Sequence, residues 1–454
     1  MAGIGHAAGA VGAFHVAYSF SHFSFLIVIY LFCLLNLARL PTTRRAFYFG
    51  LVIGLMTVGP QLNCFYNIFG WAAVALWLIL AFWIAVFVLL ARLCRTNFSS
   101  VPAAVLVPFV WTGLEYFRSE LYYLRFSWLN VGYVFSDTAQ WLPLKQLGVY
   151  GIGLLLVAIV SALSLLSANK QMGAGLGLVA ALAAITNAPQ PASPQFADSP
   201  ANLQVAGVQL EFPPEAEVLL MLNKAVRAHP QAQLLVLSEY TFDGPVPEKV
   251  KMWCRDHQRY LATGGKDWIS DSEFFDSVFV VDPHGDVVFK QAKSVPIQFF
   301  KDGLPARNQS LWESPWGRIG FCICYDLSYT RVTDRLVRLG AQALVVPTMD
   351  VVEWGKTEHL LHGRVAPVRA AEYGIPIFRV ASSGVSQLID ARGQVAASAP
   401  FPGQSAMVAG SLSLKAPGRL PWDRGVAVLS VFLTAGLIGQ LAWRALRHRS
   451  VAGA

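Results

Sequence analysis

Long apolar runs constrain the fold of this chain more than any other feature of its sequence. Most of them approach the ~20 residues that an α-helix needs to cross the hydrocarbon core of a bilayer. They cover residues 3–21, 23–40, 47–63, 71–93, 101–117, 149–167, 172–185 and 425–443. With 55% hydrophobic and only 14% charged residues, the chain is also too apolar for an ordinary soluble enzyme of 454 residues. The sequence therefore predicts an α-helical transmembrane bundle of about eight helices.

Basic residues in the short loops predict how these spans are oriented. The basic residues that follow the second, fourth, sixth and eighth runs are Arg39, Arg44, Arg45, Arg92, Arg95, Lys170, Arg444, Arg447 and Arg449. The four loops or ends that carry these residues lie on one side of the membrane if every run crosses it. Because Lys and Arg concentrate in cytoplasmic loops, we expect that side to be cytoplasmic and residues 187–423 to lie on the opposite side. Topology then explains the net charge of +8 better than nucleic-acid binding does.

The chain changes character after a proline-rich stretch. Residues 1–187 are predicted to form the transmembrane domain with about seven spans, residues 188–200 an extended linker, and residues 201–414 an α/β domain. Short apolar or alternating runs predict strands at residues 203–210, 234–237, 277–281, 319–323 and 343–346. Helical patterns cover residues 216–228, 247–260, 330–339 and 358–373. Residues 415–454 then return to the membrane with the last helix and a basic cytoplasmic tail.

The cysteine of greatest interest is Cys324, which follows an apolar, β-prone run. That run predicts a short buried strand that ends at Cys324, where Tyr325 and Asp326 begin a polar stretch. One interpretation makes Cys322 and Cys324 small core residues, because free cysteine is among the most buried residue types. The other makes Cys324 a nucleophile, since it lies nearer the polar end than Cys322. The six cysteines have no paired spacing, which predicts neither a disulfide network nor a zinc site.

Candidates for a base and a cation lie upstream of this thiol. Glu239 ends the apolar strand LLVLSE, so partial burial should raise the pKa of its carboxyl and suit it to act as a general base. The alternative is a strand-end acid that caps Thr241 or pairs with a lysine. Residues 274–296 read as strand, turn and strand, and carry Lys290 and Lys293. A lysine beside the thiol would favour the thiolate and stabilise an oxyanion, although such lysines are more often surface charges.

The order Glu239, Lys293, Cys324 resembles the Glu-Lys-Cys triad of the nitrilase superfamily of carbon-nitrogen hydrolases. Several segments follow that superfamily's pattern in order: VAGVQL, DSVFVVDPHGDVVF, GRIGFCICYDLSYTRVTDRLVRLGAQALVVPT and VRAAEYGIPIFRVASSGVSQLIDARGQV. With membrane runs before and after, the chain is similar to the N-acyltransferase members that are embedded in membranes. The segments RRAFYFGLVIGL and LKQLGVYGIGLLL resemble two membrane spans of these members, and FSWLNVGY resembles their outer loop. The resemblance implies an α-β-β-α sandwich for the nitrilase-like domain.

The same resemblance implies a mechanism and its partners. Cys324 would take an acyl chain from a phospholipid as a thioester, with Glu239 as the base and Lys293 stabilising the tetrahedral intermediate. Tyr325 and Asp326 would lie at the oxyanion hole or pocket. The acyl acceptor would be the N-terminal amine of a diacylglyceryl-cysteine lipoprotein. The setting would be the bacterial inner membrane with the catalytic domain in the periplasm, and no cofactor or metal is expected.

The sequence departs from the acyltransferase pattern in ways that leave alternatives open. After the lysine, KSVPIQFFKDG lacks the family's second glutamate, and Asp302 is the nearest acid that could replace it. The lysine lies three residues before Pro296, as in aliphatic amidases, so Lys290 remains a reserve for Lys293. TMDVVEWGKTEH replaces the S-N-D-x-W-F-G run. Trp354 is displaced there, and it remains a candidate for the lipid entrance together with Trp128.

Two other functions therefore stay open beside the acyltransferase. The first is a membrane-anchored amidase or nitrilase-like hydrolase in which water is the acceptor. The second is a scaffold with a degenerate site, in which Cys324 would react no faster than a free cysteine.

Overall fold

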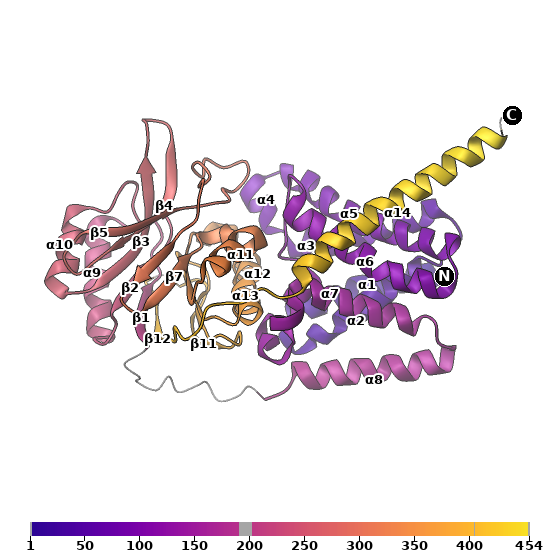
Figure 1. Cartoon of the computed structure of the whole chain (residues 1–454), viewed down its shortest axis with the longest axis horizontal. Helices are drawn as coiled ribbons and strands as arrows, with labels where there is room; N and C mark the ends of the chain where they lie inside the picture. The colour runs from indigo at the N-terminus through magenta and orange to yellow at the C-terminus, as the bar shows by residue number, and fades with distance from the viewer. Residues whose placement is uncertain (1, 190–201, 404, 453–454) are drawn as a thin grey trace. The chain divides into compact units, whose positions relative to one another are not determined.

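The computed structural model describes residues 2–189, 202–403 and 405–452, and the chain divides into two compact units (Figure 1). One unit is helical and comprises Met1–Phe135, Gln146–Ala188 and Pro421–Ala454. The other comprises Ser136–Lys145 and Pro189–Leu420 and contains all the described strands. Most of the expected linker, residues 188–200, lies outside the described residues.

Each of the apolar runs forms a helix in the helical unit. The helices are α1 (Ala2–Ser19), α2 (Ile27–Leu37), α3 (Thr43–Gln61), α4 (Cys64–Phe69), α5 (Ala72–Asn97), α6 (Ser100–Tyr116), α7 (Leu144–Leu163), α8 (Ala168–Thr186) and α14 (Asp423–Ala452). Small residues allow close packing between them, as is common in membrane helices. A side chain at Gly54 of α3 would lie 2.7 Å from the Cα of Ala81 in α5, so only glycine fits there.

The prediction of about eight spans exceeds what the helices support. In the described part of the chain, 4 helical segments are long and apolar enough to cross a membrane: Ala72–Asn97, Ser100–Leu121, Leu144–Leu163 and Asp423–Arg444. The other runs are helical, but α2 has only 11 residues, α3 has two arginines directly after its first residue, and α8 has Asn, Lys and Gln directly after its first residue. Apolar runs therefore predicted the helices correctly and overestimated the number that are long and apolar enough to span.

The second unit is built from two six-stranded sheets (Figure 1). Its strands are β1 (Leu203–Val208), β2 (Leu234–Leu237), β3 (Tyr260–Trp268), β4 (Phe274–Val281), β5 (Val287–Ala292), β6 (Leu311–Ser314), β7 (Gly317–Phe321), β8 (Ala343–Thr348), β9 (Ile377–Ala381), β10 (Ser386–Ile389), β11 (Val395–Ala399) and β12 (Met407–Leu412). The orders are β12-β1-β2-β3-β4-β5 and β11-β10-β9-β8-β7-β6. In each sheet the central strands are parallel: β1, β2 and β3 in the first, and β7, β8 and β9 in the second.

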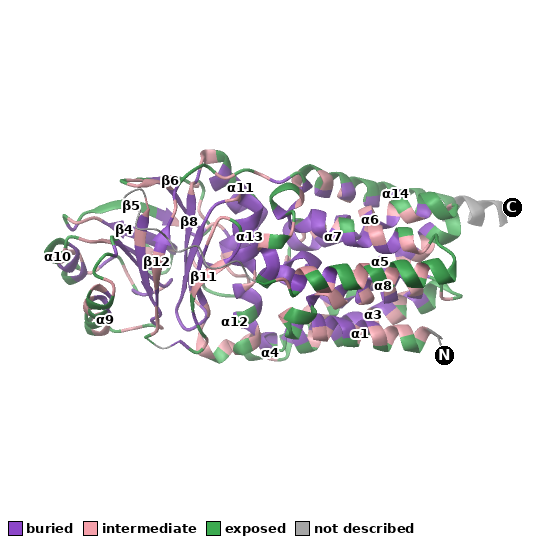
Figure 2. Cartoon of the chain, turned by 90° about the horizontal axis from the view of Figure 1, so that it is seen from below, coloured by how far each residue is buried: buried purple, intermediate pink, exposed green. Residues whose placement is uncertain are grey.

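The helices of this unit are α9 (Glu215–Ala228), α10 (Glu248–His257), α11 (Thr330–Leu339), α12 (Lys356–Gly363) and α13 (Val365–Tyr373). Successive residues of β2 point to opposite faces of its sheet. Leu234 and Val236 belong to the core between the two sheets, whereas Leu235 and Leu237 pack against α9 and α10. Figure 2 shows the central strands of both sheets as buried. The domain is thus the α-β-β-α sandwich that the sequence resemblance implied.

Two of the helices predicted in this unit differ from the sequence predictions. The helix expected at residues 247–260 ends at His257, because Gln258 adopts a left-handed conformation and β3 begins at Tyr260. The helix expected at residues 358–373 is divided into α12 and α13. Pro367 explains the break, since proline has no N–H to donate and its ring clashes with the carbonyl four residues earlier, at Gly363.

Candidate active site

The candidate residues gather at the carboxyl ends of parallel strands, where α/β folds usually place their functional groups. Glu239 follows β2, and Cys324 follows β7. Met349 and Asp350 follow β8, the neighbour of β7. Gly264 of β3 permits the local packing, because a side chain there would lie 2.5 Å from the Cα of Glu239.

Lys293 lies just after β5 and is fully buried among carboxylates. Its Nζ is 2.7 Å from Glu239 Oε1, 2.7 Å from Asp302 Oδ2 and 3.5 Å from Asp276 Oδ2. Burial and these carboxylates have opposite effects on the pKa of Lys293. Burial alone would lower the pKa of the Lys293 ammonium, but Asp302 and Glu239 raise it well above its usual value. Lys293 is therefore a permanent cation in this site.

The carboxylates around Lys293 titrate differently. Burial raises the pKa of Glu239, but attraction to Lys293 and hydrogen bonds outweigh burial, so the pKa is lowered overall. The raised pKa predicted from its strand-end position is therefore wrong, because the sequence argument did not include the lysine. Burial and the neighbouring Glu239 raise the pKa of Asp276 well above its usual value. Glu239 is thus ionised at neutral pH, while Asp276 keeps its proton.

Cys324 is buried, with a residue exposure of 1%, and begins the short 3-10 helix Cys324–Ser328. Strand β7 ends at Phe321, two residues earlier than the strand predicted at residues 319–323, so two residues separate it from the thiol. The φ of Cys324 is +51°, a conformation that non-glycine residues seldom adopt and that functional sites often hold under strain. Its Sγ contacts the Met349 carbonyl oxygen at 3.7 Å. Burial and Glu239 raise the pKa of this thiol, so it is protonated at rest.

Asp302 is the acid that the sequence singled out as a substitute for the family's second glutamate. Besides Lys293, its carboxylate accepts hydrogen bonds from the Tyr240 hydroxyl at 2.8 Å and from the Ile297 backbone N–H at 2.6 Å. These contacts hold the loop after β5 against the lysine. Lys290, the reserve candidate, is 48% exposed and pairs with Asp267 at 2.6 Å, away from the thiol.

The remaining candidates take varied positions. Tyr325 is partly buried and its ring packs edge-on against Tyr329 at 4.9 Å. Asp326 is buried, and its carboxylate accepts backbone N–H groups of Ser294, Val295 and Ile323. It therefore ties the turn that carries Cys324 to the segment that carries Lys293. Burial raises the pKa of Asp326 to about 6.

The two tryptophans proposed for the lipid entrance lie in different units. Trp128 is buried in the helical unit, where its ring packs near Phe126 at 5.1 Å. Trp354 lies in the α/β unit at the short 3-10 turn before α12 and is partly buried near Phe300, at 6.3 Å between ring centroids.

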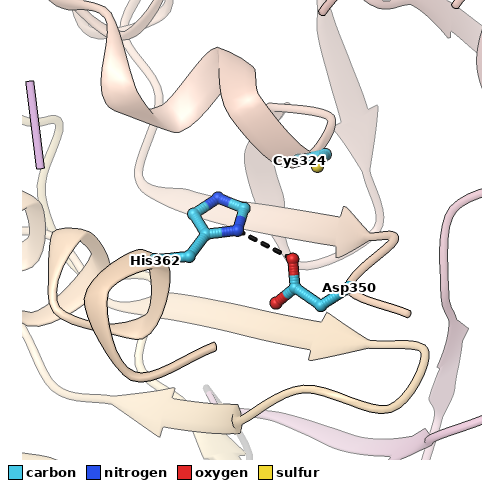
Figure 3. A group of neighbouring side chains, drawn as sticks. All are labelled: Cys324, Asp350 and His362. Carbon is cyan, nitrogen blue, oxygen red and sulfur yellow. Dashed lines mark hydrogen bonds and ion pairs between the residues drawn. The ribbon is translucent and has the colours of Figure 1, made fainter. Parts of the chain in front are cut away.

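Sequence reasoning missed a second cluster beside Cys324. His362 Nδ1 lies 2.8 Å from Asp350 Oδ1, and both are buried (Figure 3). The Arg379 guanidinium of β9 also donates to Asp350. Glu358 and His359 of α12 complete the cluster, 3.3 Å from each other. The signal available was the His-x-x-His spacing of His359 and His362 within the helix predicted at residues 358–373.

Donor groups for a metal ion are present in this region but do not fit one well. Two sets have ligand atoms within 4.8 Å of one another around Asp350: one with Cys324 and His362, and one with Glu358 and His359. Arg379 already supplies the positive charge next to Asp350. Lys293 does the same for a third set, Glu239, Asp276 and Asp302. A further cation would compete with these buried ammonium and guanidinium groups.

Comparison with known families gives the site its context. The family model for the apolipoprotein N-acyltransferase N-terminal domain matches residues 8–163, and that for carbon-nitrogen hydrolase matches residues 157–409. An apolipoprotein N-acyltransferase of Geobacter metallireducens is 25% identical over 65% of this chain and 65% of its own length. Relatives of the same name in Shewanella oneidensis and Rhizobium rhizogenes are each 26% identical, over 78% and 88% of this chain and 78% and 85% of their own lengths.

Solved structures similar to this chain include a carbon-nitrogen hydrolase of Helicobacter pylori and an amidase of Nesterenkonia sp. The first is 16% identical with a TM-score of 0.41 and covers 47% of this chain and 90% of its own. The second is 20% identical with a TM-score of 0.40 and covers 47% of this chain and 92% of its own. The carbon-nitrogen hydrolase model, in contrast, matches more than half of the chain, directly after the acyltransferase N-terminal model. This chain therefore belongs to the carbon-nitrogen hydrolase family of the nitrilase superfamily, in its membrane-associated N-acyltransferase branch.

Proposed function

We propose that this chain transfers an acyl chain from a phospholipid, through a thioester on Cys324, to the N-terminal amine of a diacylglyceryl-cysteine lipoprotein. The names of its relatives support N-acyltransferase activity. The observation that carries the mechanism is the position of Glu239. One of its oxygens accepts from Lys293, and the other accepts from the backbone of Met349, whose carbonyl contacts the sulfur of Cys324.

In the first half-reaction, Glu239 takes the proton of the resting thiol as sulfur attacks the ester carbonyl of the phospholipid. The C=O electron pair moves to oxygen, and Lys293 stabilises the oxyanion together with the backbone N–H of Tyr325. As the tetrahedral intermediate collapses, the alkoxide of the lysophospholipid leaves and receives the proton from Glu239. Asp302 holds Lys293 in place and fills the role of the missing second glutamate.

In the second half-reaction, the lipoprotein amine attacks the thioester, and an amide replaces the bond to sulfur. A thioester suits this step because amines attack it more readily than they attack an oxygen ester. We place the enzyme in the bacterial inner membrane with the α/β domain on the periplasmic side. If all eight apolar runs cross the membrane, the basic loops after the second, fourth, sixth and eighth runs lie on the cytoplasmic side and support that orientation. A site beside the membrane spares both lipid substrates the cost of leaving the bilayer.

The experiment is intact-protein mass spectrometry of the purified chain in phospholipid vesicles, before and after addition of a lipopeptide amine. Wild type should gain the mass of one acyl chain and lose it when the amine is added. Cys324→Ala should gain nothing, whereas Cys322→Ala, which changes a buried cysteine on the same segment, should behave as wild type. Wild type that gains no acyl mass would refute the proposal.

A second function, an amidase that uses water as acceptor, is favoured by the amidase-like spacing from Lys293 to Pro296. A deaminated glutathione amidase of Rattus norvegicus is also 26% identical over 42% of this chain and 63% of its own length. Release of free fatty acid without any amine acceptor would favour this hydrolase over the transferase.

A further inference from the structure

Cys324 is flanked by acid–base groups from both sheets. Glu239 and Lys293 follow strands of the first sheet. Asp350 follows β8 of the second sheet, and His362 lies on α12. The ligand atoms of Cys324, Asp350 and His362 all lie within 4.8 Å of one another (Figure 3). The thiol therefore has a histidine–aspartate pair near it in addition to the carboxylate that the family mechanism uses.

The pair is held by groups on β9 and in the loop after it. Arg379 of β9 donates to Asp350 Oδ2, and the backbone N–H of Asp350 donates to the Ser382 hydroxyl at 3.0 Å. Asp350 is thus an ionised carboxylate whose position is fixed. Its hydrogen bond to His362 Nδ1 places the ring proton on Nδ1 and leaves the basic lone pair on Nε2.

Several charged or titratable groups surround His362, and they keep it uncharged at rest. They are Asp350, Glu358, Arg379, Glu239 and Cys324. Burial lowers the pKa of His362 from its usual 6.5, even though Asp350 opposes the shift. Burial, reinforced by Asp350, raises the pKa of Glu358 well above its usual value, so Glu358 holds its proton. Asp350 and Arg379 then balance each other, and His362 is a neutral imidazole that can accept a proton.

The two half-reactions make different demands on a base. In the first, the proton comes from a thiol and goes to a leaving alkoxide. In the second, the attacking amine must lose a proton, and a free α-ammonium group has a pKa of about 7.7–8. Glu239 has a lowered pKa and both of its carboxylate oxygens are engaged, by Lys293 and by the Met349 N–H, so a second base beside the thioester would assist the loss of this proton. General-base catalysis works best when the pKa of the base lies near the working pH.

We propose that His362, held by Asp350, is the general base of the second half-reaction, a role that rests on the proposed acyl transfer. The amine nitrogen attacks the thioester carbonyl and forms the C–N bond. His362 Nε2 accepts a proton from that nitrogen, and the C–S bond breaks to release the Cys324 thiolate. The imidazolium then returns the proton to the thiolate, which restores the resting thiol and the neutral imidazole. Glu239 serves the formation of the thioester, and His362 serves its discharge.

The test separates the two half-reactions in the full-length protein in phospholipid vesicles. His362→Asn keeps an N–H that can bond to Asp350 but removes the basic nitrogen, and His284→Gln, at an exposed turn, is the matched control. His362→Asn should form the acyl-enzyme at the wild-type rate, which also reports an intact fold. Its discharge by a lipopeptide amine should be slower by about 10²–10⁴-fold. Discharge by hydroxylamine, a weakly basic nucleophile already uncharged at neutral pH, should remain at the wild-type rate.

Other outcomes would overturn the proposal. Wild-type discharge by the lipopeptide in His362→Asn would show that the histidine is not used. An equal loss in acylation, lipopeptide discharge and hydroxylamine discharge would show a structural role only. If wild type itself gains no acyl mass, the proposed function fails, and the role of His362 fails with it.

Discussion

Glu239 Oε2 accepts a hydrogen bond of 2.6 Å from the backbone N–H of Met349, so a side chain from one sheet is fixed by a strand end of the other. The carbonyl of Met349 in turn contacts Cys324 Sγ at 3.7 Å. A single residue therefore contacts both the proposed base and the proposed nucleophile. The catalytic geometry depends on how the two sheets pack, because neither sheet alone carries both groups.

Glu239→Gln should slow acyl-enzyme formation by about 10²–10⁴-fold, because an amide cannot take the proton of the Cys324 thiol. The amide oxygen can still accept from Met349, so the loss should reflect chemistry more than misfolding. The measurement is the rate of acyl mass gain on the protein. Glu273→Gln, at an exposed position, is the control and should react as wild type. An acylation rate in Glu239→Gln equal to wild type would remove Glu239 from the mechanism.

Lys293→Met and Lys290→Met form a matched pair, because Lys290 lies in β5 and Lys293 directly follows that strand. Removing Lys293 leaves buried Glu239 and Asp302 without their cation, which should lower the free energy of unfolding by about 3–5 kcal/mol and abolish acylation. The Lys290 side chain is about half exposed and pairs with Asp267. Its replacement should therefore change the free energy of unfolding by no more than about 0.5 kcal/mol. Denaturation and acyl mass gain measure the two effects. Equal losses in both variants would contradict the assignment of Lys293.

The positions of the three triad candidates could be predicted from local sequence, because each follows an apolar run that ends in polar residues. Their mutual contacts could not, since Glu239 meets Lys293 and Met349 only through strand pairing and sheet packing. The pKa of Glu239 was mispredicted for the same reason. Local reasoning included its burial but not the ammonium 2.7 Å away.

Asp276 and the Asp350–His362 pair were missed because no local pattern shows which partners a buried polar side chain will meet. Asp276 lies within the strand run FFDSVFVV, where an isolated acid usually faces solvent, yet it is fully buried. Most helices of the first unit, in contrast, were predicted to within about five residues of their observed ends, although α14 continues to Ala452 and the short helix α4 was not predicted. Periodicity and apolar length are local properties, whereas the partners of a buried charge are determined by the tertiary fold.

The predicted orientation can be tested with single added cysteines, because all six native cysteines are buried. Ser272→Cys is exposed in the α/β unit, and Asn97→Cys is exposed at the end of α5 beside Arg95. A membrane-impermeant maleimide should label Ser272→Cys in intact spheroplasts and Asn97→Cys only after permeabilisation, since basic loops are retained in the cytoplasm. The reverse labelling pattern would place the α/β domain in the cytoplasm and refute the periplasmic assignment.

Asp276→Asn should retain acylation, because the amide mimics a carboxyl group that keeps its proton beside Glu239. The pKa of Asp276 is raised in the folded chain above its usual 3.8, so the folded state holds a proton that the unfolded state releases. The resulting stability is complete below pH 3.8 and is lost as the pH rises toward the folded pKa. Asn carries its hydrogens at every pH, so the variant should gain thermal stability over wild type as the pH increases from 4 to 8.

Asp276→Leu provides the contrast, because leucine branches at Cγ as aspartate does but cannot donate to Glu239. Asp276→Leu should form the acyl-enzyme more slowly than Asp276→Asn, because the carboxylate of Glu239 then lacks the hydrogen-bond donor at residue 276. Thermal unfolding from pH 4 to 8 and acyl mass gain at pH 7 measure the two effects. If Asp276→Asn loses activity as severely as Asp276→Leu, Asp276 must work as an anion. The buried cluster would then place Glu239, Asp276 and Asp302 as anions around one ammonium, a charge excess that burial strongly opposes.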